Sequence, residues 1–409
     1  MPVVASHLKN FILPARYLKS PFDFKKATVC VIVPTYKPQE LTVRLVQDLI
    51  KWNPKISVYV VDDSTPLDYK GGAETFSRIA SVSRRVKVLC TPRNTLKAGA
   101  LNYCLKYIFE GQDTPHPEVI LTLDDDVVIS PATVRNLVVE LMSHNNLGAV
   151  CSQCRVLNKN KNLLTRLQGL EYVSFNAIRL ADEGFFKGPL VMHGMLTAFR
   201  VAALKEAGMF AEGHLIEDYE MTTRLKGAGW SVKSAVNAPA ATGGPERFSP
   251  FWRQRVRWSY GGGMVVVRAT DRLSVLQDLI GHGVFFATVL MVGLLLVSRG
   301  SGYVSPRIAQ AIVALSLLQL AIWYVFQLWL MRRYKEKDAY DWAIRVGLIP
   351  EFIYSYIMTT ILVGSYLFLF FNICKKTLAR IRGHGRLAEL GTTVFRTMGY
   401  TESWGTRTH

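Results

Sequence analysis

Three uncharged apolar runs in the second half of the chain set the strongest limit on how it can fold. They extend over residues 281–297, 308–331 and 352–374, and each approaches or exceeds the length that a helix needs to cross a bilayer. The first run is the shortest and contains His282, so a buried core helix remains an alternative there. We therefore expect a multi-pass integral membrane protein with about three apolar segments within residues 281–374.

The residues before these runs have a different character. No comparable apolar run precedes residue 281, and the first residues lack the charged, apolar and small-residue parts of a signal peptide. We expect a cytoplasmic domain over residues 28–250, followed by interfacial helices over 251–280. Residues 1–27 mix apolar and basic positions, which predicts either an amphipathic helix on the membrane or a disordered leader.

The net charge of +18 is strongly basic, and its placement narrows the possible partners. Basic residues crowd beside the apolar runs, as in segments that face anionic cytoplasmic lipid, so membrane lipid is the expected partner and nucleic acid is not. Three spans would put the basic tail, residues 375–409, outside, whereas its charge favours the inside. Either one of the apolar runs is interfacial or re-entrant, or the tail is an exception to the tendency of basic segments to lie on the cytoplasmic side.

The region from residue 28 to residue 126 alternates short apolar runs, rich in β-branched residues, with helix-like stretches. This alternation predicts an α/β domain with a parallel, Rossmann-like sheet wound by right-handed crossovers. The strands are expected at residues 28–34, 56–63, 86–90 and 119–126, and the helices at 39–52, 71–83 and 98–109. Ligands collect at the carboxyl ends of such strands, where three polar clusters fall: Pro34 to Tyr36, Asp62 to Ser64, and Asp124 to Asp126.

The acidic trio that follows the last of these strands suits a hard divalent cation. Alternate residues point the same way, so Asp124 and Asp126 are the two carboxylates that can converge. Such a pair leaves open positions on the cation for phosphate oxygens. The alternative is that one of the three caps the helix expected near Pro131.

Two further segments carry groups suited to an anionic ligand. Lys97 stands at an expected helix start, where free N–H groups and the helix dipole favour phosphate, although an exposed lysine is the plainer interpretation. Gln254, Arg257 and Trp258 share one helix face at spacings of three and four residues. The alternative for this segment is a membrane-surface helix with basic and aromatic anchors, and both interpretations can hold together.

A second acidic cluster heads another expected helix. It contains Glu217, Asp218 and Glu220. Adjacent helical positions do not share a face, so Glu217 and Glu220 are not expected beside Asp218. We expect them to favour the positive end of the helix or to pair with Arg224.

Seven short motifs in this order resemble the membrane-embedded family 2 glycosyltransferases, which include cellulose, chitin, hyaluronan and poly-N-acetylglucosamine synthases. The resemblance covers about residues 28 to 261, and its motifs are PTY, VDDS, KAGALN, LTLDDD, HGMLTAF, IEDYE and QRVRW. It implies a GT-A type glycosyltransferase domain followed by a helical transmembrane region, with a UDP-sugar donor and Mg²⁺ or Mn²⁺ as cofactor.

The resemblance also implies roles for individual residues. Asp218 matches the general base of an inverting reaction, and Asp124 and Asp126 match the DxD metal site, with Asp124 also beside the nucleotide. The implied nucleotide contacts are Thr35, Tyr36, Asp62, Asp63 and Lys97. The implied contacts to acceptor and pyrophosphate are Gly194, Gln254, Arg257 and Trp258.

Two positions depart from the family's pattern. The usual acid after the PTY motif is replaced by Lys37 and Pro38, which puts that nucleotide contact in doubt. The centre of the DxD motif, usually a small residue, is Asp125, which leaves the metal-binding pair ambiguous by one residue.

The leading functional hypothesis is a processive synthase that makes a β-linked polysaccharide from UDP-N-acetylglucosamine or UDP-glucose. The alternative is a single-addition glycolipid synthase of the ceramide glucosyltransferase kind, whose acceptor is a lipid. A third class is a non-catalytic nucleotide-sugar sensor or scaffold. Three membrane-spanning helices are few to enclose a channel for a polymer. Self-association or a partner subunit that contributes further helices is therefore also a hypothesis.

Overall fold

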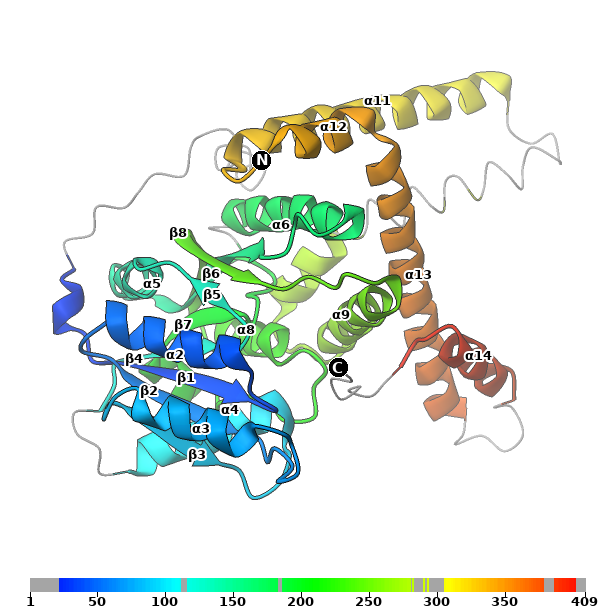
Figure 1. Ribbon diagram of the computed structural model, residues 1–409. Helices are drawn as coiled ribbons and strands as arrows, with labels where there is room; N and C mark the ends of the chain where they lie inside the picture. The colour runs from blue at the N-terminus through cyan, green and yellow to red at the C-terminus, as the bar shows by residue number, and fades with distance from the viewer. Residues whose placement is uncertain are drawn as a thin grey trace.

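The structure, a computed structural model, describes residues 22–111, 116–182, 186–280, 282, 290, 293, 305–378 and 386–401. At its centre is an 8-stranded sheet in the order β3-β2-β1-β4-β7-β6-β8-β5 (Figure 1). The strands are β1 (Val29–Thr35), β2 (Ser57–Asp62), β3 (Val86–Cys90), β4 (Val119–Leu123), β5 (Val128–Ile129), β6 (Leu147–Val156), β7 (Leu196–Arg200) and β8 (Ser231–Thr242).

The first four strands are parallel, as the alternation of strands and helices predicts. In register, Thr35 at the end of β1 lies opposite Asp62 at the end of β2, and the amide of Asp63 donates to the Thr35 carbonyl at 2.9 Å. The ends of β1, β2 and β4 therefore meet at one edge of the sheet. β4 ends at Leu123, immediately before the acidic trio.

The second half of the sheet departs from the predicted parallel order. β7 runs antiparallel to both of its neighbours, β4 and β6, and β5 is antiparallel to β8. The segment between β6 and β7 contains α6 (Leu163–Ala181). This helix buries Leu167, Leu170 and Val173 against the C-terminal helices, so it does not pack on the sheet alone. Because β7 is reversed, its beginning lies beside the end of β4, and the amide of Asp124 donates to the Met195 carbonyl at 3.0 Å.

Helices cover both faces of the sheet because successive residues of each strand point to opposite sides. Val29, Val31 and Val33 of β1 face one core, and Cys30 and Ile32 face the other. The helices on the first face are α2 (Glu40–Trp52), α3 (Gly72–Ser81) and α5 (Thr133–Met142); those on the second are α4 (Leu96–Glu110), α7 (Val201–Glu206) and α8 (Glu217–Gly227). Helices α2, α3 and α4 lie where the sequence predicts them.

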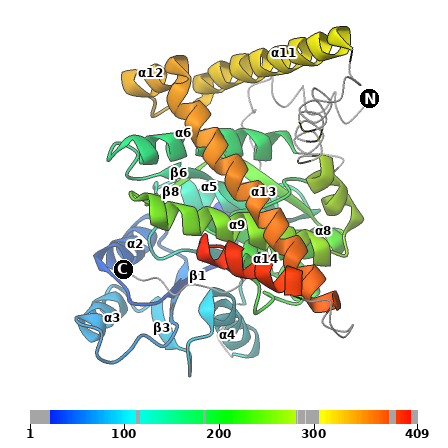
Figure 2. The same cartoon turned by 90° about the vertical axis from the view of Figure 1, so that its right-hand side faces the viewer.

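Five labelled helices follow the sheet: α9 (Phe248–Arg268), α11 (Pro306–Leu330), α12 (Ala339–Gly347), α13 (Ile349–Leu378) and α14 (Arg386–Thr397). Within the described residues, two helical stretches are long and apolar enough to cross a membrane, Pro306–Leu330 and Ile349–Lys376. They contain the second and third apolar runs, whereas the run at 281–297 lies outside the described residues except at 282, 290 and 293. Figure 2 shows α13 passing across α9, with α14 beside α13. The sequence did not predict α14.

Ion pairs fasten the start of α6 to the start of α12. Arg166 lies 2.8 Å from Asp338 and 3.0 Å from Asp341, and Lys159 lies 2.7 Å from Asp341. The carboxylate of Asp341 is buried between these two cations. The sheet-covering helix α6 is thereby held to the segment that joins the two apolar helices.

Candidate active site

The middle residue of the acidic trio is part of the sheet edge. The Thr35 hydroxyl donates to Asp125 Oδ2 at 2.6 Å, and both side chains are buried. Asp124 and Asp126 on either side are only partly buried. The alternative in which one of the trio caps the next helix is wrong, because the N-cap of α5 is Ala132 and the residues hydrogen-bonded there are Ser130 and Thr133.

The two aspartates at the end of β2 shape the loops around this edge. Asp62 Oδ1 accepts the amide of Thr65 at 2.9 Å. Asp63 Oδ1 accepts both the amide and the hydroxyl of Thr95, at 2.8 and 2.9 Å, and so fixes the start of α4. A nucleotide-binding role for both aspartates stays a prediction.

Lys37 and Pro38, which differ from the family's pattern after the PTY motif, lie in a tight turn. Lys37 has φ of 58°, and its amide donates to the Thr65 hydroxyl at 2.9 Å. Its ammonium lies 5.4 Å from the centre of the Tyr36 ring. The turn thus places a cation beside Tyr36, where the family's pattern has an acid.

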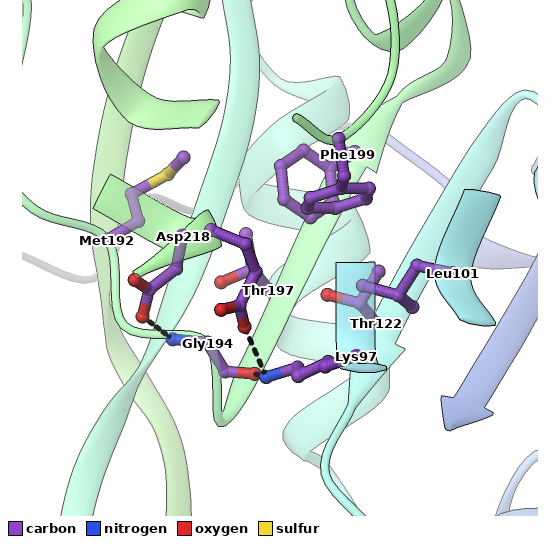
Figure 3. Close-up of a pocket in the computed structure, with 10 residues that line it drawn as sticks. Lys97, Leu101, Thr122, Met192, Gly194, Thr197, Phe199 and Asp218 are labelled. Carbon is purple, nitrogen blue, oxygen red and sulfur yellow. Dashed lines mark hydrogen bonds and ion pairs between the residues drawn. The ribbon is translucent and has the colours of Figure 1, made fainter. Parts of the chain in front are cut away.

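Lys97 lies at the centre of the candidate site (Figure 3). Its ammonium lies 2.6 Å from Asp124 Oδ1 and 3.1 Å from Glu217 Oε1, and it donates to the Gly194 carbonyl at 2.9 Å. Burial lowers the pKa of Lys97, but the charges of Asp124 and Glu217 outweigh burial and hold that pKa above its usual range. One permanent positive charge therefore joins the end of β4, the start of β7 and the start of α8.

Asp218 lies on the other side of Gly194. Asp218 Oδ2 accepts the Gly194 amide at 2.5 Å, and Oδ1 accepts its neighbour's amide, that of Tyr219, at 2.7 Å. Burial raises the pKa of Asp218 to about 6, and the charge of Glu217 adds to this, whereas Lys97 and the two amides lower it. The carboxylate is thus held in a fixed orientation and titrates near neutral pH.

Gly194 is the point where these groups approach the backbone most closely. A Cβ atom there would lie 2.7 Å from the Lys97 nitrogen, 3.1 Å from Asp218 Oδ2 and 3.4 Å from Glu217 Oε1. A side chain at this position therefore displaces at least the ammonium. Glycine at position 194 thus leaves the space in which the Lys97 ammonium lies.

Glu217 lies in the first turn of α8, as expected, but the expectation that it lies away from Asp218 is wrong; the pairing of Glu220 with Arg224 is confirmed. Glu217 and Asp218 both line the pocket, although adjacent helical residues do not share a face, because they occupy the first turn of α8 and the long side chain of Lys97 reaches Glu217. Glu220 pairs with Arg224, with Oε1 at 2.6 Å from Nε. The cluster thus divides into one largely buried ion pair outside the pocket lining and two site carboxylates.

The sequence analysis did not single out the remaining pocket walls, because a motif does not show which of its apolar and hydroxyl side chains face a pocket. Thr122 of β4 and Thr197 and Phe199 of β7 line it beside Lys97, as Figure 3 shows. The full lining is Lys97, Leu101, Thr122, Met192, Gly194, Thr197, Phe199, Phe210, Glu217 and Asp218.

The QRVRW segment lies on α9, as its spacing predicts. Gln254 and Trp258 both contact Arg255, which lies between them in sequence: Arg255 donates to Gln254 Oε1 at 2.6 Å, and its guanidinium carbon lies 4.2 Å from the centre of the Trp258 ring. Arg257 is partly buried on the same helix. From the sequence, Arg255 was expected to be one of the basic residues that face the membrane surface. In the structure its side chain is buried, with 1% of its surface exposed.

Comparison with known proteins agrees with this geometry. A sequence model of glycosyl transferase family group 2 matches residues 119–372, more than half of the chain. The chain is 29% identical over 175 residues to the poly-beta-1,6-N-acetyl-D-glucosamine synthase of Staphylococcus epidermidis, a match that covers 43% of this chain and 40% of that relative. It is 25% identical over 243 residues to the probable glycosyltransferase YdaM of Bacillus subtilis, covering 59% of this chain and 56% of that relative.

A solved structure shares the fold. The mannosyltransferase PcManGT from Pyrobaculum calidifontis, in complex with GDP-Man and Mn²⁺, superposes with a TM-score of 0.54 at 18% identity, covering 82% of this chain and 98% of that one. The mixed sheet with helices on both faces is therefore of the GT-A type. The family match shows that the chain belongs to the family 2 glycosyltransferases, and it spans less than half the length of the Staphylococcus epidermidis relative.

Proposed function

We propose that this enzyme is an inverting, metal-dependent membrane glycosyltransferase that moves a sugar from a UDP-sugar to a growing β-linked polysaccharide, with Asp218 as the general base. The observation that carries the proposal is that Lys97 and Asp218 both bind the Gly194 backbone and that Asp124 pairs with Lys97. A carboxylate able to accept a proton thus lies near an acidic strand end suited to the cation that would bind a diphosphate.

The proposed reaction is a single displacement. Asp218 takes the proton of the acceptor hydroxyl while that oxygen attacks the anomeric carbon of the donor. The bond from this carbon to the diphosphate oxygen breaks, and UDP leaves with the electron pair. Attack from the side opposite the leaving group inverts the configuration, so an α-linked donor gives a β-linked product. The two amides that hold Asp218 leave its carboxylate oriented for this proton transfer.

The acidic trio fits a divalent cation. Asp125 is committed to Thr35, whereas Asp124 and Asp126 are more exposed and stand at alternate positions. Within the described residues, no group of three or more His, Cys, Asp or Glu side chains could hold a metal ion. In proteins, Mg²⁺ is commonly bound by one or two carboxylates and by phosphate oxygens of the substrate. Asp124 and Asp126 would hold Mg²⁺ or Mn²⁺, which neutralises charge on the departing diphosphate.

Chelation is expected to abolish transfer reversibly. EDTA treatment of the purified enzyme should remove UDP release, and added Mn²⁺ or Mg²⁺ should restore it, because the diphosphate otherwise leaves without its counter-charge. Asp126→Asn should raise the Mn²⁺ concentration needed for half-maximal rate by about tenfold or more, since a neutral amide is a weaker ligand for a hard cation. Full activity in EDTA would contradict the metal assignment.

The rate of transfer is expected to depend on the protonation of Asp218. Only the carboxylate accepts a proton, so kcat/KM should rise with pH through about 6 and level off above it. Below this value, each pH unit should lower kcat/KM about tenfold. Initial rates of UDP release from about pH 5 to about pH 8 measure this limb. A rate that stays constant down to the range of an ordinary carboxyl would contradict the raised pKa.

The polymer and donor are proposed from the relatives. Several of them are named poly-beta-1,6-N-acetyl-D-glucosamine synthases, which favours UDP-N-acetylglucosamine as donor over UDP-glucose. Incubation of enzyme-containing membranes with radiolabelled UDP-sugars tests this directly. A ladder or high polymer supports a synthase, and one lipid-soluble product supports the glycolipid alternative. No UDP release with any donor, despite UDP binding, would overturn the enzymatic proposal for this chain.

The membrane arrangement is part of the proposal. We place α11 and α13 in the bilayer and the sheet domain on the cytoplasmic side, where UDP-sugars are made. The length and apolar character of both helices support this arrangement, as do the basic residues that flank them. Self-association or a partner subunit completing a channel belongs to the same proposal.

A further inference from the structure

The largest fully buried side chain in the described structure is that of Arg255, on α9 between the two motif residues Gln254 and Trp258. Its guanidinium donates to Gln254 Oε1 at 2.6 Å and lies 4.2 Å from the Trp258 ring centre. On its other side, Nη2 lies 2.5 Å from Glu171 Oε2. One cation therefore contacts an amide, an indole and a carboxylate.

The carboxylate that holds Arg255 is shared with the membrane-side helix. Glu171 belongs to α6, and its Oε2 also accepts the hydroxyl of Tyr354 on α13 at 2.8 Å. The Tyr354 ring packs against Phe251 of α9, with ring centres 5.5 Å apart. Three helices, α6, α9 and α13, thus meet at this carboxylate.

A purely structural role does not explain a buried charge here. Removing a guanidinium and a carboxylate from water is unfavourable, and well-packed apolar residues serve stability as well or better. Apolar residues, however, cannot make directional hydrogen bonds that fix the orientation of a neighbouring side chain. The planar guanidinium presents donors at fixed angles and a flat face for an aromatic ring, which a lysine does not.

We propose that Arg255 is a positioning residue for the acceptor side of the site: it orients Gln254 and Trp258, and is itself oriented by Glu171 and, through that carboxylate, by Tyr354 of α13. This inference rests on the proposed function and on the acceptor contacts that the resemblance to family 2 glycosyltransferases implies for Gln254 and Trp258. A shift of α13 against α9 changes the hydrogen bonding of Glu171 and hence the plane of the Trp258 indole. The membrane helix is therefore coupled to acceptor binding.

The first test is kinetic. In the full-length enzyme, with UDP-N-acetylglucosamine as donor and short β-linked N-acetylglucosamine oligomers as acceptor, Arg255→Lys should raise the acceptor KM about tenfold and leave the donor KM unchanged. Tyr354→Phe should shift the acceptor KM in the same direction by a smaller factor. Arg253→Gln, an exposed arginine two residues earlier on α9, is the matched control and should change neither KM.

A change in kcat alone, or equal changes in both KM values, would overturn the inference, because partial misfolding lowers the amount of active enzyme without selecting the acceptor. The second test does not need catalysis. Acrylamide quenching of Trp258 fluorescence, taken as the difference between each protein and its Trp258→Phe form, should increase about twofold in Arg255→Lys once the cation–π contact is lost. If quenching in Arg255→Lys is unchanged, the inference is wrong, even when the enzyme accepts none of the donors tested. If the wild type is inactive but quenching increases as expected, only the proposed function is wrong.

Discussion

Replacement of Asp218 by asparagine is expected to lower the rate of sugar transfer by about 10² to 10⁴ while leaving the affinity for UDP nearly unchanged. Asparagine has the same shape and still accepts the Gly194 amide through its oxygen, but it has no carboxylate to take the acceptor proton. The residual rate reflects the donor's good leaving group and the positioning of both sugars. Steady-state rates and calorimetric UDP binding on the same purified protein measure the two quantities.

The matched control for this substitution lies in the same helix. Glu220→Gln also removes one negative charge from the first turns of α8, but it breaks the pair with Arg224 and not a contact of the pocket. It should retain transfer within a few-fold of the wild type, since Glu220 does not line the pocket and glutamine still offers Arg224 an acceptor oxygen. If UDP affinity falls as steeply as the rate in Asp218→Asn, the residue binds the donor and is not the base.

Gly194→Ala is expected to lower kcat by about 10²-fold with little change in the thermal midpoint. The added Cβ would lie 2.7 Å from the Lys97 nitrogen, so the ammonium must move away from its contacts with the Gly194 carbonyl, Asp124 and Glu217. The same atom would lie 3.1 Å from Asp218 Oδ2. A displacement of about 1 Å in reacting or positioning groups is enough for an effect of this size.

A second glycine separates crowding from a general intolerance of alanine. Gly262 lies on α9, and a Cβ there would meet Tyr219 Cε1 at 3.5 Å, an ordinary van der Waals distance. Gly262→Ala should therefore keep kcat near that of the wild type. Comparable losses in both variants would show that the effect at Gly194 is not caused by its contacts with Lys97 and Asp218.

The parallel half of the fold follows directly from the sequence. The strands that end at Thr35, at Asp62 and before the acidic trio can be predicted from runs of β-branched residues followed by polar residues. In a parallel sheet the carboxyl ends of these strands lie at the same edge. Asp218, placed by its motif at the head of a helix, also lies where it was expected. Local patterns suffice for such features because strand ends and helix starts carry their own chemical markers.

The features that the sequence did not predict depend on contacts between distant segments. The strand around Thr197 has nothing in its residues that marks its direction, so its antiparallel placement was missed. Glu217 was assigned away from the site because helical spacing does not reveal that Lys97 reaches it from another helix. Arg255 resembles other membrane-facing arginines until Glu171, 84 residues earlier, is seen beside it.

The reversed strand β7 has a consequence for how the enzyme is made. It lies between β4 and β6, which both precede it in the chain, and Gly194, whose backbone Lys97 and Asp218 both bind across 97 and 24 residues of sequence, stands just before it. A nascent chain that has released only β1 to β4 from the ribosome holds the acidic trio but not Asp218. If the proposed assignment is correct, substrate binding is complete only late in synthesis, and on denaturation it should disappear in the same cooperative step as the sheet itself.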